Sequence, residues 1–136
     1  MSNQYGLNRY KQTSITTASR GQVIVLLYEG CIKFLKKAAT AIQEKKIADK
    51  GIYIGKAQDI INELNNSLNH ELGGDISREL EKLYNYMFEQ TTEANLNSDV
   101  KPLEVSIKLL ETLLDGWRVA VTKSPQESMD KMESEK

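Results

Sequence analysis

The side chain best suited to acid–base or phosphoryl chemistry is His70, the only histidine in the chain. A single imidazole on a bundle helix is a feature of phosphotransfer modules. This histidine comes just before Gly73-Gly74, where the sequence predicts the end of a helix. In the last turn of a helix, an imidazolium interacts favourably with the negative end of the helix dipole. A structural role is therefore favoured, and phosphotransfer is an alternative that depends on His70 alone.

Metal binding and nucleophilic catalysis have no better candidates. No second histidine follows at zincin spacing, and the chain has no Glu-x-x-His pair of the kind found in di-iron bundles. Cys31 falls between two apolar stripes of its predicted helix, which favours a small buried hydrophobic residue over a nucleophile. Gly73-Gly74 lacks the strand and the lysine of a phosphate-binding loop. The sequence predicts no catalytic residue, metal site or cofactor, and an enzyme is not expected.

The composition is that of one globular domain. The chain has 136 residues, 40% hydrophobic and 27% charged, which is enough to form an ordinary core. Its 18 basic and 19 acidic side chains form no basic block, which disfavours nucleic acid as a partner. A single cysteine gives no internal disulfide, and no apolar signal sequence opens the chain. The longest apolar run, Val23–Tyr28, is too short for a membrane span, so we expect a cytoplasmic protein without membrane insertion.

Glycine and proline occur at only a few positions and predict long helices. A capping box at Ser19 begins the first helix, Asp75 caps the third, and Pro102 lies in the first turn of the fourth. The four expected helices cover about 19–44, 49–71, 75–96 and a segment around Pro102 that ends near Thr122.

These helices predict the fold class. No segment alternates as a strand would, and short connections make sequential helices antiparallel. The predicted fold is all-α, an antiparallel up-and-down four-helix bundle with a short N-terminal arm or helix. Residues 1–18 are the arm, residues 19–122 the bundle domain, and residues 123–136 a charged tail that we expect to be disordered.

The first predicted helix has an apolar face about twice as wide as one bundle seam requires. One stripe contains Val23, Leu27 and Phe34. The second stripe runs along Ile24, Tyr28, Ile32, Leu35, Ala39 and Ile42. A wide apolar face indicates that more than one element packs against this helix.

The second stripe allows three interpretations. The N-terminal arm or a central position in the bundle could cover it. It could instead form a groove for the amphipathic helix of a partner, with an arm that moves aside when the partner binds. A third possibility is the seam of an isologous dimer, which would make the protein a self-associating helical scaffold or adaptor. We expect a monomer or a weak homodimer.

Several short segments form a recognisable pattern when they are taken in order. They are Tyr10 with Thr17-Ala18-Ser19, Leu26–Gly30, Lys56-Ala57, Ile60–Leu64, Gly73–Ile76, Leu83–Met87, Ala94-Asn95 and Trp117. Together they resemble the FliS family of flagellin-specific export chaperones. The resemblance covers about Leu7 to Trp117, with Arg20 at a position where the family usually has proline.

The resemblance implies a function as well as a helical bundle. Members of this family bind the disordered C-terminal segment of flagellin and keep flagellin from polymerising prematurely in the cytoplasm. They then present the complex to the flagellar type III export gate, and they hydrolyse no nucleotide. A disordered client loses entropy when it binds, so a long apolar interface is expected.

The expected partner-binding residues come from two sources. Leu7 and Tyr10 match the arm that the family places at the client groove, and Tyr28, Tyr84 and Asn95 match other family positions. The apolar pattern of the helices adds four residues. The complete predicted set is Leu7, Tyr10, Ile24, Tyr28, Ile32, Leu35, Tyr84, Phe88 and Asn95.

Overall fold

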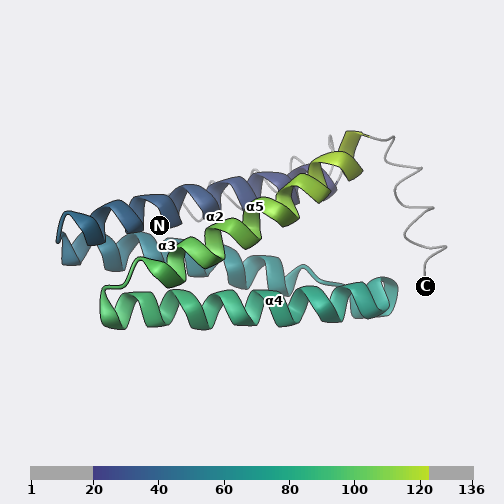
Figure 1. The fold of residues 1–136 in the computed structure, drawn as a ribbon. Coiled ribbons are helices and arrows are strands. Elements are labelled where there is room, and N and C mark those ends of the chain that lie inside the picture. The colour runs from purple at the N-terminus through teal and green to yellow at the C-terminus, as the bar shows by residue number, and fades with distance from the viewer. Residues whose placement is uncertain (1–19, 123–136) are drawn as a thin grey trace.

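The structure, a computed structural model, describes residues 20–122 and consists there of four helices without a strand. The helices are α2 (Arg20–Gln43), α3 (Ile47–Asn66), α4 (His70–Asn97) and α5 (Lys101–Thr122). Short connections join them into an antiparallel bundle (Figure 1). The predicted all-α four-helix bundle is therefore confirmed. The predicted arm and the predicted tail lie outside the described residues.

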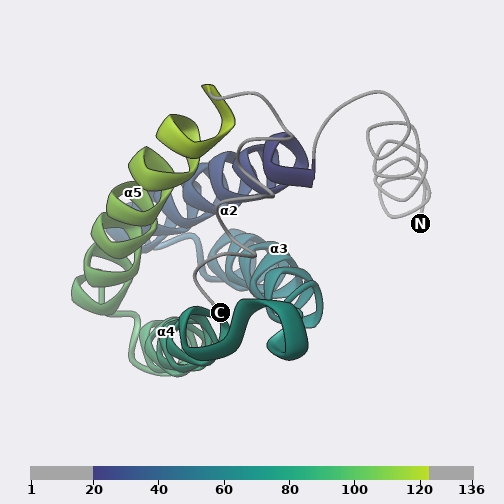
Figure 2. The same cartoon turned by 90° about the vertical axis from the view of Figure 1, so that its right-hand side faces the viewer.

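The four helices form a ring in which each helix packs against two others. α2 packs against α3 and α5, and α4 packs against the same two helices from the opposite side. α2 and α4 are therefore diagonal to each other, as the end-on view shows (Figure 2). α4 and α5 lie close together at the loop that connects them. Their separation increases along α5, and the C-terminal end of α5 lies near α2 (Figures 1 and 2).

The wide apolar face of α2 is explained by this ring. Tyr28, Ile32 and Leu35, from the second stripe, are buried in the same core as Val23 and Leu27 from the first. One side of α2 packs on α3, the other side packs on α5, and the residues between them fill the bundle interior. The bundle itself therefore buries Tyr28, Ile32 and Leu35 of the second stripe and leaves its other residues, Ile24, Ala39 and Ile42, half-buried.

The connection between α3 and α4 differs from the prediction. α3 ends at Asn66, and the side chain of Asn69 caps α4 by accepting hydrogen bonds from the backbone N–H groups of Glu71 and Leu72, both at 3.1 Å. Gly74 has a φ of +54°, so the predicted break at Gly73-Gly74 is a kink inside α4. Asp75 is therefore not the cap of α4, because the Asn69 side chain caps this helix six residues earlier.

A buried lysine joins the start of α3 to the end of α4. The Lys50 side chain is 6% exposed, and its Nζ donates hydrogen bonds of 2.8 Å to the backbone oxygen of Asn95 and to Oγ of Ser98. A cation at this position stabilises the negative end of the α4 dipole and the left-handed Ser98 that ends the helix. This contact holds the two helices in register at the end opposite to Gly74.

Candidate functional site

His70 and Cys31, the two candidates for chemistry, each contact other groups of the bundle. His70 is the first residue of α4, and its Nε2 lies 3.5 Å from Oε2 of Glu81, so the predicted position in the last turn of the preceding helix is wrong. Cys31 is fully buried, with Sγ 3.6 Å from the backbone oxygen of Ala57, and burial raises the pKa of its thiol to about 12. Between residues 20 and 122, no three acidic, histidine or cysteine side chains cluster where a metal ion could bind.

Two tyrosines meet in the centre of the bundle. The Tyr28 and Tyr84 hydroxyls are 2.6 Å apart across the α2–α4 diagonal, and the side chains are 0% and 1% exposed. The Tyr28 ring also lies 6.5 Å from the Trp117 ring of α5. Burial raises the pKa of both tyrosines, most strongly that of Tyr84. In this conformation the two tyrosines form the core, and a contact of either one with a partner stays a prediction.

The other predicted partner-binding residues fall into three groups. Ile32 and Leu35 are buried in the chain without a partner, and their contact with a client stays a prediction. Ile24 and Phe88 are half-buried, and so is Asn95, whose backbone oxygen accepts the hydrogen bond from Lys50. Leu7 and Tyr10 lie outside the described residues.

The seam between α2 and α5 is bridged by charged side chains. Nη2 of Arg118 lies 2.8 Å from Oε2 of Glu29, and Nζ of Lys36 lies 3.6 Å from Oε2 of Glu111. These side chains surround a surface hollow of about 480 Å³ that Ile32 and Leu114 also line. Because the rim is charged and internally paired, this seam offers little apolar surface to a partner.

The seam between α4 and α5 has the opposite character. Asn85 accepts a hydrogen bond from Asn65 of α3, so its flank of α4 points towards α3 and away from α5. Glu111 pairs with Lys36 of α2, so its flank of α5 points towards α2 and away from α4. A shift of two residues turns a helix by about 200°, so Leu83 and Leu109 lie on the flanks that face each other. We call the apolar residues of these flanks the α4–α5 surface. It comprises Ile76, Leu83 and Tyr86 of α4 and Val105, Leu109 and Leu113 of α5.

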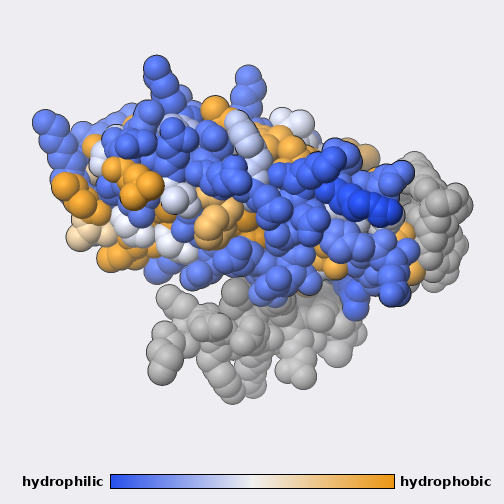
Figure 3. All heavy atoms as spheres, turned by 90° about the horizontal axis from the view of Figure 1, so that it is seen from below, coloured by the Kyte–Doolittle hydropathy of each residue, from blue (hydrophilic) through white to orange (hydrophobic). Residues whose placement is uncertain are grey.

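The α4–α5 surface is partly open to solvent. Ile76, Tyr86 and Val105 are 55%, 43% and 45% exposed, and the three leucines are half-buried. The view that looks onto α4 shows hydrophobic areas between hydrophilic side chains (Figure 3). Exposed apolar residues that follow two adjacent helices are typical of an interaction site. The sequence carried a signal for them, because Val105 and Leu109 point away from the main apolar stripe of their helix.

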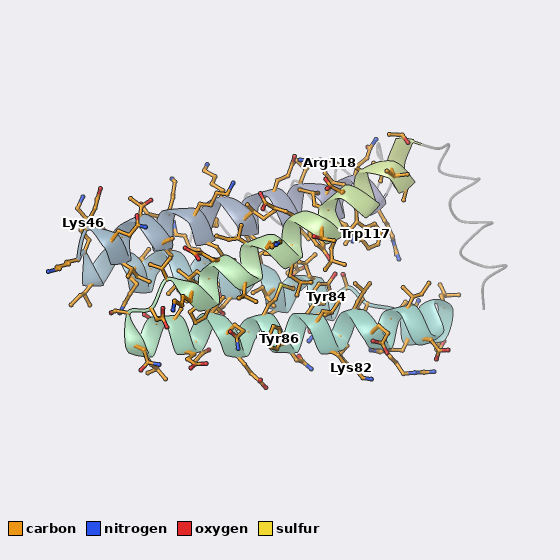
Figure 4. All side chains as sticks on the ribbon, viewed as in Figure 1. Lys46, Lys82, Tyr84, Tyr86, Trp117 and Arg118 are labelled. Atoms are coloured by element: carbon orange, nitrogen blue, oxygen red, sulfur yellow. The ribbon has the colours of Figure 1, made fainter. Side chains whose placement is uncertain are left out.

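The two sides of α5 carry different kinds of side chain, as the stick view shows. Trp117 lies on the side of α5 towards α4, and Arg118 lies on the opposite side (Figure 4). Tyr84 extends from α4 towards the space between the two helices (Figure 4). No helix between residues 20 and 122 has the length and hydrophobicity needed to span a membrane.

The family model described as "Flagellar protein FliS" matches residues 1–124. The chain belongs to the FliS family. The "Flagellar secretion chaperone FliS" of Bacillus subtilis is 34% identical over 82% of this chain and 83% of its own length. The "Flagellar secretion chaperone FliSB" of Pseudomonas aeruginosa is 39% identical over 82% and 91%. A solved structure described as "Crystal structure of flagellar chaperone from bacteria" superposes with a TM-score of 0.73 at 26% identity, over 88% of this chain and 98% of the other.

Membership of the FliS family confirms the resemblance seen in the sequence. The relatives are named as flagellar secretion chaperones, so this chain has the role of a chaperone in flagellum biogenesis and is not an enzyme. The helical bundle agrees with the fold of the solved flagellar chaperone. For a chaperone, the feature to explain is a surface that receives another protein, and the α4–α5 surface has the composition this requires.

Proposed function

We propose that this FliS protein binds the disordered C-terminal segment of flagellin in the cytoplasm, prevents its premature polymerisation and delivers it to the flagellar type III export gate. The family supports a flagellar export chaperone, and flagellin is the client that the FliS resemblance implies. The observation that carries the proposal is the α4–α5 surface, where apolar side chains of two helices are left partly exposed.

An amphipathic segment of the client fits this surface. Ile76 and Leu83 are seven residues apart on one flank of α4, and Leu109 and Leu113 are four apart on α5, so a helix laid between them meets apolar side chains along both edges. Burial of that surface offsets the entropy that a disordered client loses on binding. A chaperone of this kind needs no catalytic group.

The N-terminal arm contributes to the same site in our proposal. Because the bundle is antiparallel, the N-terminus of α2 and the C-terminus of α5 lie at the same end of the bundle. At this end α5 is separated from α4. Leu7 and Tyr10 precede α2 in the sequence, and the first turns of α2 contain the half-buried Ile24, which is the third predicted contact at this end. Phe88 and Asn95 stay predictions as further contacts.

Co-expression of the chain with a flagellin C-terminal segment, followed by co-purification and isothermal titration, tests the proposal. Ile76→Asp on the α4–α5 surface and Ile52→Asp on α3 form a matched pair, because both isoleucines are 55% exposed. We expect Ile76→Asp to weaken client binding at least tenfold, about 1.4 kcal/mol. Ile52→Asp is expected to bind as the wild type does, and both variants are expected to keep their stability within about 0.5 kcal/mol.

Two results would contradict the proposal. One is a folded wild-type protein that does not bind the flagellin segment. The other is equal binding by the Ile76→Asp and Ile52→Asp variants, which would leave the family role intact and remove the α4–α5 surface from it. Light scattering addresses the scaffold alternative, because a tight dimer that does not dissociate on dilution would favour self-association over client binding.

The role of the arm is tested by deleting residues 1–8 and by Tyr10→Ala. We expect both changes to weaken binding of the flagellin segment in isothermal titration, since they remove apolar contacts with the client. If both variants bind as tightly as the wild type, the arm has no part in the site.

A further inference from the structure

The Tyr28–Tyr84 pair lies in a core whose other buried members are mainly aliphatic. The two hydroxyls satisfy each other at 2.6 Å, which avoids the cost of a buried polar group without a partner. Since α2 and α4 are diagonal and their backbones do not approach each other, the two side chains span the interior end to end. Two tyrosines that meet at their hydroxyls form a longer connection than two leucines would, so they hold α4 away from α2.

The adjacent residues determine where α5 lies. Trp117 packs against Tyr28 with a ring separation of 6.5 Å, and the next residue along each helix, Arg118 and Glu29, forms the 2.8 Å ion pair. Two consecutive residues of α5 thus contact two consecutive residues of α2. Ion pairs join α5 to α2, side-chain hydrogen bonds join α4 to α3, and the two tyrosines join α2 to α4, while leucines of α5 and leucine and methionine of α4 belong to one apolar core.

We propose that four residues keep α4 and α5 apart, so that the α4–α5 surface is open before a client binds. The Tyr28–Tyr84 pair holds α4 away from α2, and the contacts of Trp117 and Arg118 hold the C-terminal half of α5 on α2. These are positioning residues, since all of them act through the placement of α4 and α5. A surface that is already open at binding loses less free energy to rearrangement than one that must first open. The part of this inference that concerns client binding rests on the proposed function.

The separation of the helices can be measured without any client. Spin labels at Lys82→Cys on α4 and Val119→Cys on α5, in a Cys31→Ala background, report the distance between the two helices by electron paramagnetic resonance. The two label sites are two residues from Tyr84 and from Trp117, respectively, and both are exposed. We expect Tyr84→Leu to shorten the mean distance, because a shorter side chain lets α4 move into the bundle.

Matched variants separate positioning from simple core packing. Tyr53→Phe on α3 removes a hydroxyl outside the cluster and is expected to change neither the distance nor client affinity. If the Tyr84→Leu variant does not fold, the distance is measured in the Tyr84→Phe variant. Arg118→Glu is expected to shift α5, and the charge exchange Glu29→Arg with Arg118→Glu is expected to restore its position, because the ion pair is re-formed with reversed polarity.

Client affinity gives the second measurement. We expect Tyr84→Leu, at a temperature where it is folded, to bind the flagellin C-terminal segment about tenfold more weakly through loss of a preformed surface. An unchanged or longer distance, with only the unfolding midpoint lowered, would show that the tyrosines fill the core and position nothing. If wild type and variants all fail to bind flagellin while the distance shortens as expected, the positioning role stands and the proposed function fails.

Discussion

The two seams that α5 forms with its neighbours have opposite chemistry. Towards α2, the ion pairs of Arg118 with Glu29 and of Lys36 with Glu111 close the surface over buried apolar residues. Towards α4, apolar residues such as Tyr86 and Val105 are left 43% and 45% exposed. One helix thus carries a closed, self-sufficient interface on one flank and an incomplete one on the other.

The difference between the two seams indicates that one contributes mainly to stability and the other mainly to recognition. A seam whose apolar residues are buried and whose rim is paired contributes mainly to folding, and its substitution costs free energy of unfolding. A seam with part-exposed apolar residues contributes less to folding and leaves surface that a partner can bury. Tyr84 and Tyr86 show the contrast within one helix, because they are two residues apart and are 1% and 43% exposed. The following predictions test whether this separation holds.

The largest effect is expected at the α2–α5 seam. Ile32 is 8% exposed, so Ile32→Asp places a carboxylate in the apolar interior and is expected to destabilise the protein by more than about 4 kcal/mol. Urea unfolding followed by circular dichroism measures the change. A cooperative transition close to that of the wild type, combined with lost client binding, would instead return Ile32 to the client site and end the distinction between the two seams.

The next effect concerns pH and the buried tyrosines. Burial raises the pKa of Tyr28 and Tyr84 in the folded protein, so above the unfolded value of about 10 the unfolded chain has released protons that the native chain still holds. The contribution of the two tyrosines to stability is therefore full below about pH 10 and falls above it by about 1.4 kcal/mol per pH unit for each of them. The Cys31 thiol, with its pKa raised to about 12, adds to this decline.

Urea unfolding at pH 8 and at pH 11 measures the alkaline loss. The Tyr28→Phe/Tyr84→Phe double variant is the control, since it lacks both ionisable hydroxyls without leaving one of them unpaired. It is expected to lose less stability between the two pH values than the wild type does. An equal loss in both proteins would show that the tyrosines do not account for it.

A smaller effect is expected from the ion pair on the rim of the closed seam. The Arg118 and Glu29 side chains are 51% and 43% exposed, so Arg118→Ala is expected to cost only about 0.2–1 kcal/mol of stability, less at high salt. A double-mutant cycle with Glu29→Ala isolates the pairwise contribution. A coupling well above this range that persists at 1 M salt would mean that the rim contributes to folding as strongly as the buried residues do.

The smallest effect is expected at His70, whose ion-pair partner Glu81 belongs to the same helix. His70 and Glu81 are 44% and 46% exposed, so His70→Ala should cost no more than about 0.5 kcal/mol and leave client binding as in the wild type. Thermal unfolding and isothermal titration check both expectations. Loss of motility in cells that carry a folded, client-binding His70→Ala variant would revive the phosphotransfer alternative.

The fold could be predicted from the sequence because its signals are local. Helix periodicity, Pro102 in the first turn of α5 and the scarcity of glycine and proline indicated four helices, and their boundaries agree closely except between α3 and α4. There the prediction placed the start of the helix at Asp75, directly after Gly73-Gly74. The structure uses Asn69 as the cap and bends at Gly74.

The candidate site could be predicted only in part. The family pattern identified the kind of protein and pointed to Tyr28 and Tyr84, yet the same tyrosines lie in the core. A wide apolar face on one helix indicates that the helix has several neighbours, and it does not say whether a neighbour belongs to the same chain. For α2, both neighbours are α3 and α5 of this protein.

The sequence by itself determined the elements and the family, because each depends on residues that are near one another along the chain or that occur in a fixed order. Only the tertiary structure decided which apolar stripe is buried and which stays partly open. That outcome depends on the tilt of α5 from α4 towards α2, and so on contacts between residues 56 and 89 positions apart, the Tyr28–Tyr84 and Glu29–Arg118 pairs. Contacts at such separations leave no local pattern, since neither residue constrains the backbone around the other until the chain is folded.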